Sequence, residues 1–313
     1  MYIPHYLNIR SYIMKRYLSS LLAFLLLPLL LHARAEGHFD RTLSVSGAVS
    51  LDVTTGSGDI TVKTGGSNQV VIHGTIHPSS WIFGDSDAVQ KVQSNPPIEQ
   101  NGNSIRIGYN LPDDVKRHVS IEYEITVPGN TAVQAHTGSG NLDVAGVTSG
   151  VQAITGSGDI RLRDLGGQQQ VHTGSGNIRA ENVAAPFRAQ TGSGDIEANL
   201  TGSGEVDALT GSGTIHLRGI NGSVQGRTGS GDIETNGNVS GPWQLRSGSG
   251  NVRLAVASTT GFNLDLHTSS GSIHSDLPIT VQGSMNPHEL KGTVRGGGPT
   301  VEVSTGSGDV EIR

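Results

Sequence analysis

One short stretch, Thr155-Gly-Ser-Gly-Asp159-Ile160, recurs along most of the chain and decides its fold. The pattern returns at steps of 18 or 19 residues, beginning at Thr137, Thr173, Thr191, Thr210, Thr228 and Ser247. Other copies, some of them looser, begin at Thr55, Thr201, Thr268 and Thr305. A fixed period of this size is typical of a solenoid in which each repeat forms one coil.

Each repeat holds two apolar runs separated by turns. In one repeat, Ile160-Arg-Leu162 is the first run, Gly166-Gly167 is a turn, and Val171-His-Thr173 is the second run. The alternation predicts strands with one buried face. We therefore predict an all-β fold, a single-stranded parallel β-helix of about nine or ten coils with a strand-rich N-terminal cap. An aromatic content of only 4% agrees with a thin core of Ile, Val, Leu and Ala.

The Gly-Ser-Gly turns are interpreted as structural corners. A phosphate loop would be followed by a helix, whereas an apolar run of strand type follows each turn here. Calcium-binding β-rolls place Asp two positions after the last Gly, whereas Asp159 follows Gly158 directly, so calcium is the weaker alternative. We expect Gly56, Gly156 and their equivalents to adopt positive φ. The residues assigned to this turn motif are Gly138, Gly156, Gly158, Asp159, Gly174, Gly192, Asp195, Gly229 and Asp232.

The residue after each Gly-Ser-Gly alternates between Asn and Asp in the regular coils. The order is Asn141, Asp159, Asn177 and Asp195. Equivalent residues of stacked strands lie about 4.8 Å apart, where a column of Asp would repel itself. The alternation therefore indicates a stacked ladder with one coil per repeat.

No catalytic, cofactor-binding or metal-binding residue is predicted. His136 and His172 occupy equivalent positions two coils apart, about 9.6 Å, which is too far to share a metal ion. Asp113-Asp114 is interpreted as part of a solvated loop. The outward residues between Asp143 and Arg253 mix charges without a cluster of carboxylates with Lys, Arg or His. Ice binding through the Thr column is an alternative that depends on whether the column points outward.

The N-terminus has the pattern of a secretory signal. Lys15 and Arg16 precede the apolar run of residues 21–31, and Ala33-Arg34-Ala35 predicts cleavage before Glu36. Residues 1–35 hold four of the 21 basic residues and none of the 27 acidic ones, so the rest of the chain has a net charge of −10. This charge disfavours nucleic acid as a partner. The absence of Cys excludes disulfides and thiol catalysis.

These patterns predict three regions: a signal peptide over 1–35, a strand-rich cap over 36–130 with an early repeat, and the β-helix over 131–313. An apolar clump at Trp81-Ile82-Phe83 and a short helix near Asp85 interrupt the repeat in the cap. The segment from Leu277 to Pro299 is predicted to be an insertion near the end of the stack.

The repeats, the strand Ile121-Glu-Tyr-Glu-Ile-Thr-Val-Pro128 and the closing Thr305-Gly-Ser-Gly-Asp309-Val resemble the bacterial putative-adhesin β-strand-repeat family. That family is a domain of unknown function, and the resemblance implies an exported parallel β-helix with no site residues to transfer. We expect a non-catalytic surface or periplasmic protein that contacts a polysaccharide or another cell-surface polymer. The alternatives are a self-assembling envelope scaffold and a carbohydrate-active enzyme. No small-molecule cofactor is expected.

Overall fold

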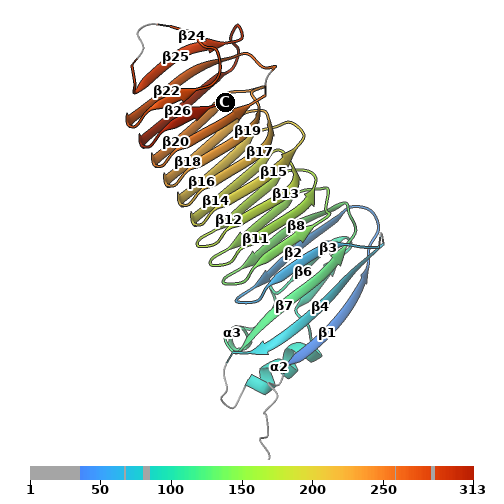
Figure 1. Ribbon diagram of the computed structural model, residues 1–313. Helices are drawn as coiled ribbons and strands as arrows, with labels where there is room; N and C mark the ends of the chain where they lie inside the picture. The colour runs from blue at the N-terminus through green and yellow to red at the C-terminus, as the bar shows by residue number, and fades with distance from the viewer. Residues whose placement is uncertain (1–35, 67, 80–84, 258, 283–285) are drawn as a thin grey trace, which may run out of the picture. The chain divides into compact units, whose positions relative to one another are not determined.

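The computed structural model describes residues 36–66, 68–79, 85–257, 259–282 and 286–313. Within these residues the chain forms two long sheets that face each other across a thin apolar core (Figure 1). The predicted parallel β-helix is confirmed, and ten of its coils carry the Thr-Gly-Ser-Gly corner or a variant of it. The signal segment and the Trp81 clump lie outside the described residues. No described helix is long and apolar enough to cross a membrane.

The two sheets, here called sheet A and sheet B, divide the strands between them. Sheet A contains, in spatial order, β1 (Gly37–Ser44), β4 (Gln69–Pro78), β7 (Val119–Val127), β3 (Ile60–Thr64), β9 (Leu142–Ala145), β11 (Ile160–Leu165), β13 (Ile178–Ala184), β15 (Ile196–Thr201), β17 (Ile215–Asn221), β19 (Ile233–Asn238), β21 (Val252–Val256), β27 (Val310–Ile312) and β23 (Ile273–Ser275). Sheet B contains β24 (Thr280–Val281), β25 (Glu289–Val294), β22 (Phe262–Ser270), β26 (Thr300–Ser307), β20 (Trp243–Ser249), β18 (Val224–Ser230), β16 (Val206–Ser212), β14 (Phe187–Ser193), β12 (Gln169–Thr173), β10 (Val151–Thr155), β8 (Thr131–Thr137), β2 (Val49–Thr55), β6 (Ser104–Ile107) and β5 (Ile98–Asn101).

Each coil passes from a strand of sheet B through the Thr-Gly-Ser-Gly corner into a strand of sheet A. The register is set by the apolar residue that follows the corner, so that Ile160 pairs with Leu142 on one side and Ile178 on the other. These residues are buried, and their neighbours along each strand point outward. The copy at Thr201 is an exception, because it forms the opposite corner, between β15 and β16.

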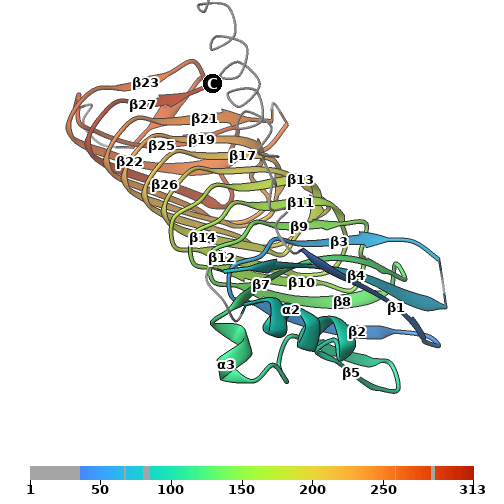
Figure 2. The same cartoon turned by 90° about the horizontal axis from the view of Figure 1, so that it is seen from below.

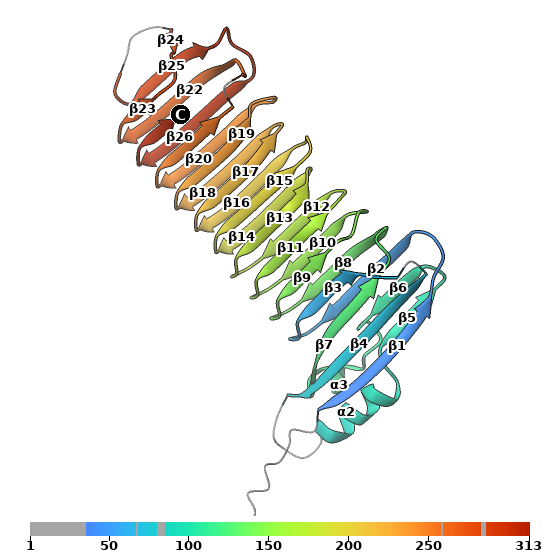
Figure 3. The same cartoon turned by 45° about the vertical axis from the view of Figure 1, so that its right-hand side comes forward.

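Both ends of the repeat are interleaved with segments that are distant in sequence. The early copy at Thr55 forms a regular coil, β2–β3, which lies between β6–β7 and β8–β9. At the other end, the last coil in sequence, β26–β27, lies between β20–β21 and β22–β23 (Figure 3). The stacking order therefore differs from the sequence order at both ends, and the first and last coils in sequence, β2–β3 and β26–β27, each have a neighbour on both sides.

The N-terminal end of the stack is closed by an antiparallel extension. Strands β1, β4 and β7 pair antiparallel in sheet A. Helix α2 (Asp85–Ser94) packs against them with Ala88, Val89 and Val92 buried, and the short helix α3 (Asp113–Lys116) lies nearby (Figure 2). Asp113 and Asp114 form the first turn of α3, so their assignment to a loop is wrong, although both side chains are exposed.

Candidate functional site

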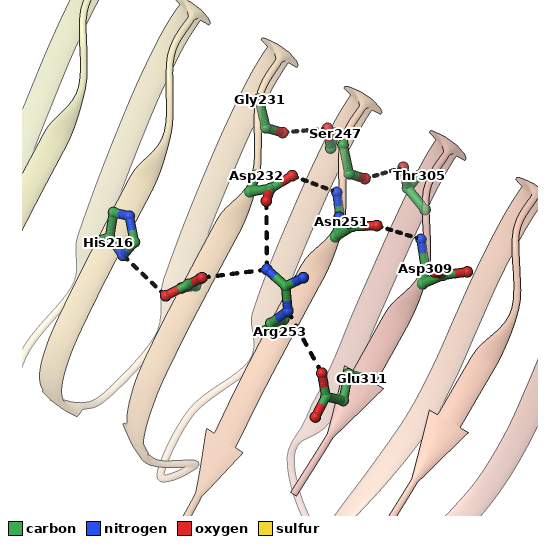
Figure 4. Close-up of polar contacts among 11 residues, drawn as sticks. His216, Gly231, Asp232, Ser247, Asn251, Arg253, Thr305, Asp309 and Glu311 are labelled. Atoms are coloured by element: carbon green, nitrogen blue, oxygen red, sulfur yellow. Dashed lines mark hydrogen bonds and ion pairs between the residues drawn. The ribbon is translucent and has the colours of Figure 1, made fainter.

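The threonine column of the corners lies inside the stack. Apart from Thr55, which donates to the Ile121 carbonyl, each Thr hydroxyl of the column donates to a glycine carbonyl of the adjacent coil; Thr173 Oγ1, for example, lies 2.8 Å from the Gly158 oxygen. Ser247 and Thr305 repeat this contact with Gly231 and Gly250 (Figure 4). The column is buried along the whole regular stack. Ice binding through this column is therefore ruled out, because the hydroxyls do not face solvent.

The corner glycines are required by close approach of the coils. Gly56 and Gly156 do not adopt positive φ, so that expectation is wrong. A Cβ atom added at Gly158 would lie 2.0 Å from the Gly140 oxygen, and one added at Gly156 would lie 2.4 Å from the Gly138 oxygen. The same distances recur at Gly174, Gly176, Gly192 and Gly194 to within 0.1 Å. A side chain at these positions would hold neighbouring coils apart.

The Asp/Asn column is confirmed as a ladder, and its side chains have a defined role. At every step except that between Thr214 and Asp232, the N–H of one residue donates to the side-chain oxygen of its neighbour, as Asn177 does to Asp159 (2.9 Å) and Asp195 does to Asn177 (2.9 Å). In spatial order the column reads Asp59, Asn141, Asp159, Asn177, Asp195, Thr214, Asp232, Asn251, Asp309 and Ser272. No two acidic residues are adjacent in it.

The hydroxyl ladder supports a first prediction. Replacing Thr173 with valine keeps the buried shape but removes the donor to the Gly158 carbonyl, and should destabilise the protein by about 1 kcal/mol in urea unfolding. Thr61→Val is the matched control, because Thr61 faces outward on β3 and no hydrogen bond of its side chain is formed within the described residues. Equal stability of the two variants would contradict a role for the buried hydroxyls.

The contact between Asp309 and Ser272, which joins the coils β26–β27 and β22–β23, gives a pH-dependent prediction. The Ser272 N–H and then its hydroxyl, both 2.8 Å from Asp309 Oδ1, lower the pKa of that carboxyl. Because the pKa of the Asp309 carboxyl is lower in the folded protein than in the unfolded chain, the contact stabilises the fold at pH values above the unfolded-state pKa. This stabilisation is lost as the pH falls through the folded-state pKa. We expect the protection factors of the β23 amides, which compare exchange with that of an unfolded chain at the same pH, to fall on acidification, and Asp309→Asn to suppress that fall. An unchanged acid response in the variant would contradict the assignment.

The outer face of sheet A carries a network of ion pairs. Arg253 lies 3.4 Å from Asp232, 3.3 Å from Glu234 and 3.5 Å from Glu311, and His216 Nδ1 lies 3.1 Å from the other oxygen of Glu234 (Figure 4). The prediction that the outward residues hold no cluster of carboxylates with Arg or His is therefore wrong. The carboxylates come from two coils, those of β19 and β27, which the stacking order places on either side of Arg253 on β21.

Two shallow hollows lie beside this network. One, of about 220 Å³, is lined by Arg179, Asp195, Glu197, His216 and Arg218. The other, of about 200 Å³, is lined by His216, Glu234, Arg253 and neighbouring strand residues. Glu197 and Glu234 in these hollows pair with Arg side chains of nearby coils, whereas Asp195 forms no ion pair among the described residues. Much of the charge on this part of the face is thus neutralised within the protein.

The outer face of sheet B also carries ion pairs, such as Arg188 with Asp207, but one part of it differs in chemistry. Gln134, Gln152 and Gln170 lie in register on β8, β10 and β12 and form what we call the amide column. Within the described part of the chain, their side chains have no hydrogen-bond partner. A parallel row of His136, Ile154 and His172 lies beside the column in the predicted register.

An exposed aromatic ring lies near the N-terminal end of the amide column. Asp52 pairs with Gln134 on one side and Arg106 on the other, and Tyr109 donates to Asp52 (2.6 Å). Burial of the hydroxyl and this hydrogen bond raise the pKa of Tyr109 to about 12. The Arg106 guanidinium lies 4.2 Å from the ring centroid. Tyr109 is the one large apolar side chain classed as exposed among the described residues.

A further hollow lies in the cap. It has a volume of about 560 Å³ between α2, α3 and the chain around Pro97. Val92, Leu111 and Val115 contribute its apolar lining. Its charged lining residues are Asp87 and Lys91, with Lys91 3.9 Å from Asp114. The size suits a small molecule, but the polar residues that line the hollow do not indicate one ligand class.

The sequence also matches a family model. The model of the Toastrack DUF4097 family matches residues 45–209 and 91–313. The chain belongs to this family. The resemblance inferred from the repeats is thereby confirmed, and the Toastrack match covers the stack and most of its cap.

Solved structures give further likenesses to this Toastrack chain. A "putative adhesin" from Parabacteroides distasonis ATCC 8503 has 12% sequence identity and a TM-score of 0.43, with 90% of this chain and 98% of that chain covered. A "putative adhesin" from Bacteroides fragilis NCTC 9343 has 14% identity and a TM-score of 0.37, with 90% and 99% covered. A "putative lipid binding protein" from P. distasonis ATCC 8503 has 12% identity and a TM-score of 0.26, with 88% and 97% covered. No curated protein matches the sequence.

Proposed function

We propose that this Toastrack protein is exported after removal of residues 1–35 and acts as a non-catalytic, adhesin-like binding protein at the cell surface or in the periplasm. Its ligand in this proposal is an uncharged, hydroxyl-rich polymer such as a polysaccharide. The amide column of sheet B carries the proposal. The side-chain amides of Gln134, Gln152 and Gln170 repeat at the strand spacing and are free to donate and accept hydrogen bonds.

The contrast between the two outer faces supports this choice of surface. On the part of sheet A formed by β13 to β21, several charged side chains already pair with one another. On sheet B the amide column is neutral, and it favours a polymer of hydroxyl or amide groups over a charged one. Tyr109, near the end of the column, offers an aromatic ring against which a sugar ring can pack. A solenoid face of this kind suits an extended ligand.

An enzyme acting on carbohydrate is the second candidate, because Glu234, His216 and Arg253 line a hollow on sheet A. Self-assembly through the coil ends has less support. The free edge strands at the C-terminal end are short, with three residues in β23 and two in β24, and short edges resist pairing with another chain.

The experiment uses purified residues 36–313 with isolated envelopes and a panel of neutral and anionic polysaccharides. Bound protein and newly formed reducing ends are recorded in the same tubes. Saturable binding to a neutral polymer without product is the expected result. Product release would favour the enzyme, and binding only to anionic polymers would contradict the proposed ligand class.

A pair of matched variants tests the surface. Gln152→Glu combined with Gln170→Glu adds two charges to the amide column and should weaken binding about tenfold. Asn199→Asp combined with Asn236→Asp adds two charges to the outer face of sheet A and should leave binding unchanged. Equal losses in the two double variants would exclude the amide column as the contact surface.

A further inference from the structure

The start of β1 has an arrangement that the proposed function does not use. Cleavage before Glu36, on which this inference rests, leaves Glu36-Gly37-His38 as the first three residues. A free α-amino group, the next two amide nitrogens and the imidazole of a third-position histidine can surround one ion with four nitrogens. A square-planar nitrogen site of this kind suits Cu²⁺ or Ni²⁺, and Cu²⁺ binds the more tightly of the two.

The histidine in question is available. His38 points outward from β1 and is exposed, and within the described residues its imidazole has no hydrogen-bond or ion-pair partner. The other two histidines of this face are engaged. His73 contacts Asp40, and His77 lies between Glu36 (3.4 Å) and Glu122 (3.3 Å).

One edge of the strand is open, although Gly37 itself is buried beside Val89 of α2 and must leave the strand to bind a metal ion. Strand β1 is the edge of sheet A and pairs only with β4. Successive amides of a strand point to opposite sides, so at most one of the Gly37 and His38 amides can donate to β4. Metal binding would therefore release at most one ladder bond at the very end of the strand.

The local charge favours a cation. Glu36, Asp40, Glu122 and Glu124 lie on the same outward face of β1, β4 and β7, and the only Lys or Arg of these strands is Arg41, which is exposed and donates to the Asp40 carbonyl. Such a surface raises the local concentration of divalent cations. Among the described residues, no three His, Cys, Asp or Glu side chains are placed to hold a metal ion. The site inferred here needs only one side chain, because its other three donors are main-chain nitrogens.

We propose that the amino terminus of the exported protein, Glu36-Gly37-His38, is a Cu²⁺ site. Its ligands are the α-amine of Glu36, the deprotonated amides of Gly37 and His38, and Nδ1 of His38. Binding at neutral pH releases one proton from the amine and two from the amides, and the copper keeps its oxidation state. The Glu36–His77 contact is lost when the first residues leave the strand.

The experiment begins with the full chain produced in an exporting host, and intact mass gives the first residue of the product. Cu²⁺ is then added in weak buffer, and the visible d–d absorption and the released protons are followed. We expect one equivalent to give the band of a four-nitrogen square-planar site with three protons released. His38→Ala should abolish the band, whereas His73→Ala should retain it.

An inserted alanine between Ala35 and Glu36 provides the sharpest control, because it keeps every side chain and moves His38 to the fourth position. The band should be lost in that variant once its mass shows the added residue at the amino terminus. The metal site would be refuted, and export left intact, if a chain that begins at Glu36 gave no absorption band. The same conclusion would follow if the band persisted in both the insertion variant and the His38→Ala variant. A product that retains residues 1–35 would overturn the export proposal and the site with it.

Discussion

Gly158→Ala is expected to destabilise the protein by about 3 kcal/mol, near the upper end of the cost of overpacking. The added Cβ would lie 2.0 Å from the Gly140 oxygen and 2.6 Å from its carbonyl carbon. Both atoms belong to the backbone of the next coil, which ladder hydrogen bonds hold on either side. No side chain can move away to relieve the clash, so the coils themselves must separate. Urea unfolding followed by circular dichroism measures the loss.

The same motif supplies the control for this prediction. Gly56 occupies the first glycine position of the early copy, and a Cβ added there would meet nothing within 4 Å. Gly56→Ala should therefore change stability by less than about 0.5 kcal/mol. Gly156→Ala, at the equivalent position in the regular stack, should lie between the two because its Cβ would approach the Gly138 oxygen to 2.4 Å. A similar loss in Gly56→Ala and Gly158→Ala would mean that corner flexibility, and not coil spacing, requires glycine.

The period of the repeat is sufficient to predict the coil. An apolar residue follows every corner, and Ile160, Ile178 and Ile196 consequently stack in register in sheet A. The Asn/Asp alternation predicts the stacking of the coils for a physical reason, because adjacent carboxylates repel. The chemistry of one column of side chains therefore identifies which repeats are neighbours in space.

The stacking order at the ends cannot be read from the motif alone. The copies at Thr268 and Thr305 are both compatible with a coil next to Ser247, and long-range pairing selects Thr305. One signal is present in the sequence: placing Asp309 beside Asn251 keeps strict alternation, whereas placing Ser272 there puts two uncharged residues together. Applied to all copies, the alternation rule favours the observed order.

The charge network on sheet A escapes prediction for the same reason. Glu311 lies beside Arg253 only because β27 inserts next to β21. Asp232 is predicted to serve only the turn, yet its second oxygen reaches Arg253 while the first accepts the Asn251 N–H. The role of the corner glycines is mispredicted because the sequence motif alone does not show whether glycine is needed for a positive φ or for the close approach of two neighbouring coils. That distinction depends on the distance to the next coil.

Asn177→Asp is expected to destabilise the protein by about 2 kcal/mol at low ionic strength and neutral pH. It would put three carboxylates in adjacent coils, at positions 159, 177 and 195, with about 4.8 Å between strands. Two unit charges at that distance repel by roughly 1 kcal/mol in water, and two such pairs would form. The change is otherwise conservative, because an aspartate oxygen can still accept the Asp195 N–H that Asn177 accepts now.

The electrostatic origin of the loss can be separated from any steric one. Near 1 M salt the screening length falls to about 3 Å, so most of the lost stability should return. Acidification should also restore it as the crowded carboxylates become protonated. Combining Asn177→Asp with Asp195→Asn removes one of the two repulsive pairs and should recover about half of the loss, because Asp195 forms no ion pair within the described residues. A loss of stability that persists in high salt and in the double variant would contradict the electrostatic explanation. The alternation of Asn and Asp in the column would then serve the packing of the coils.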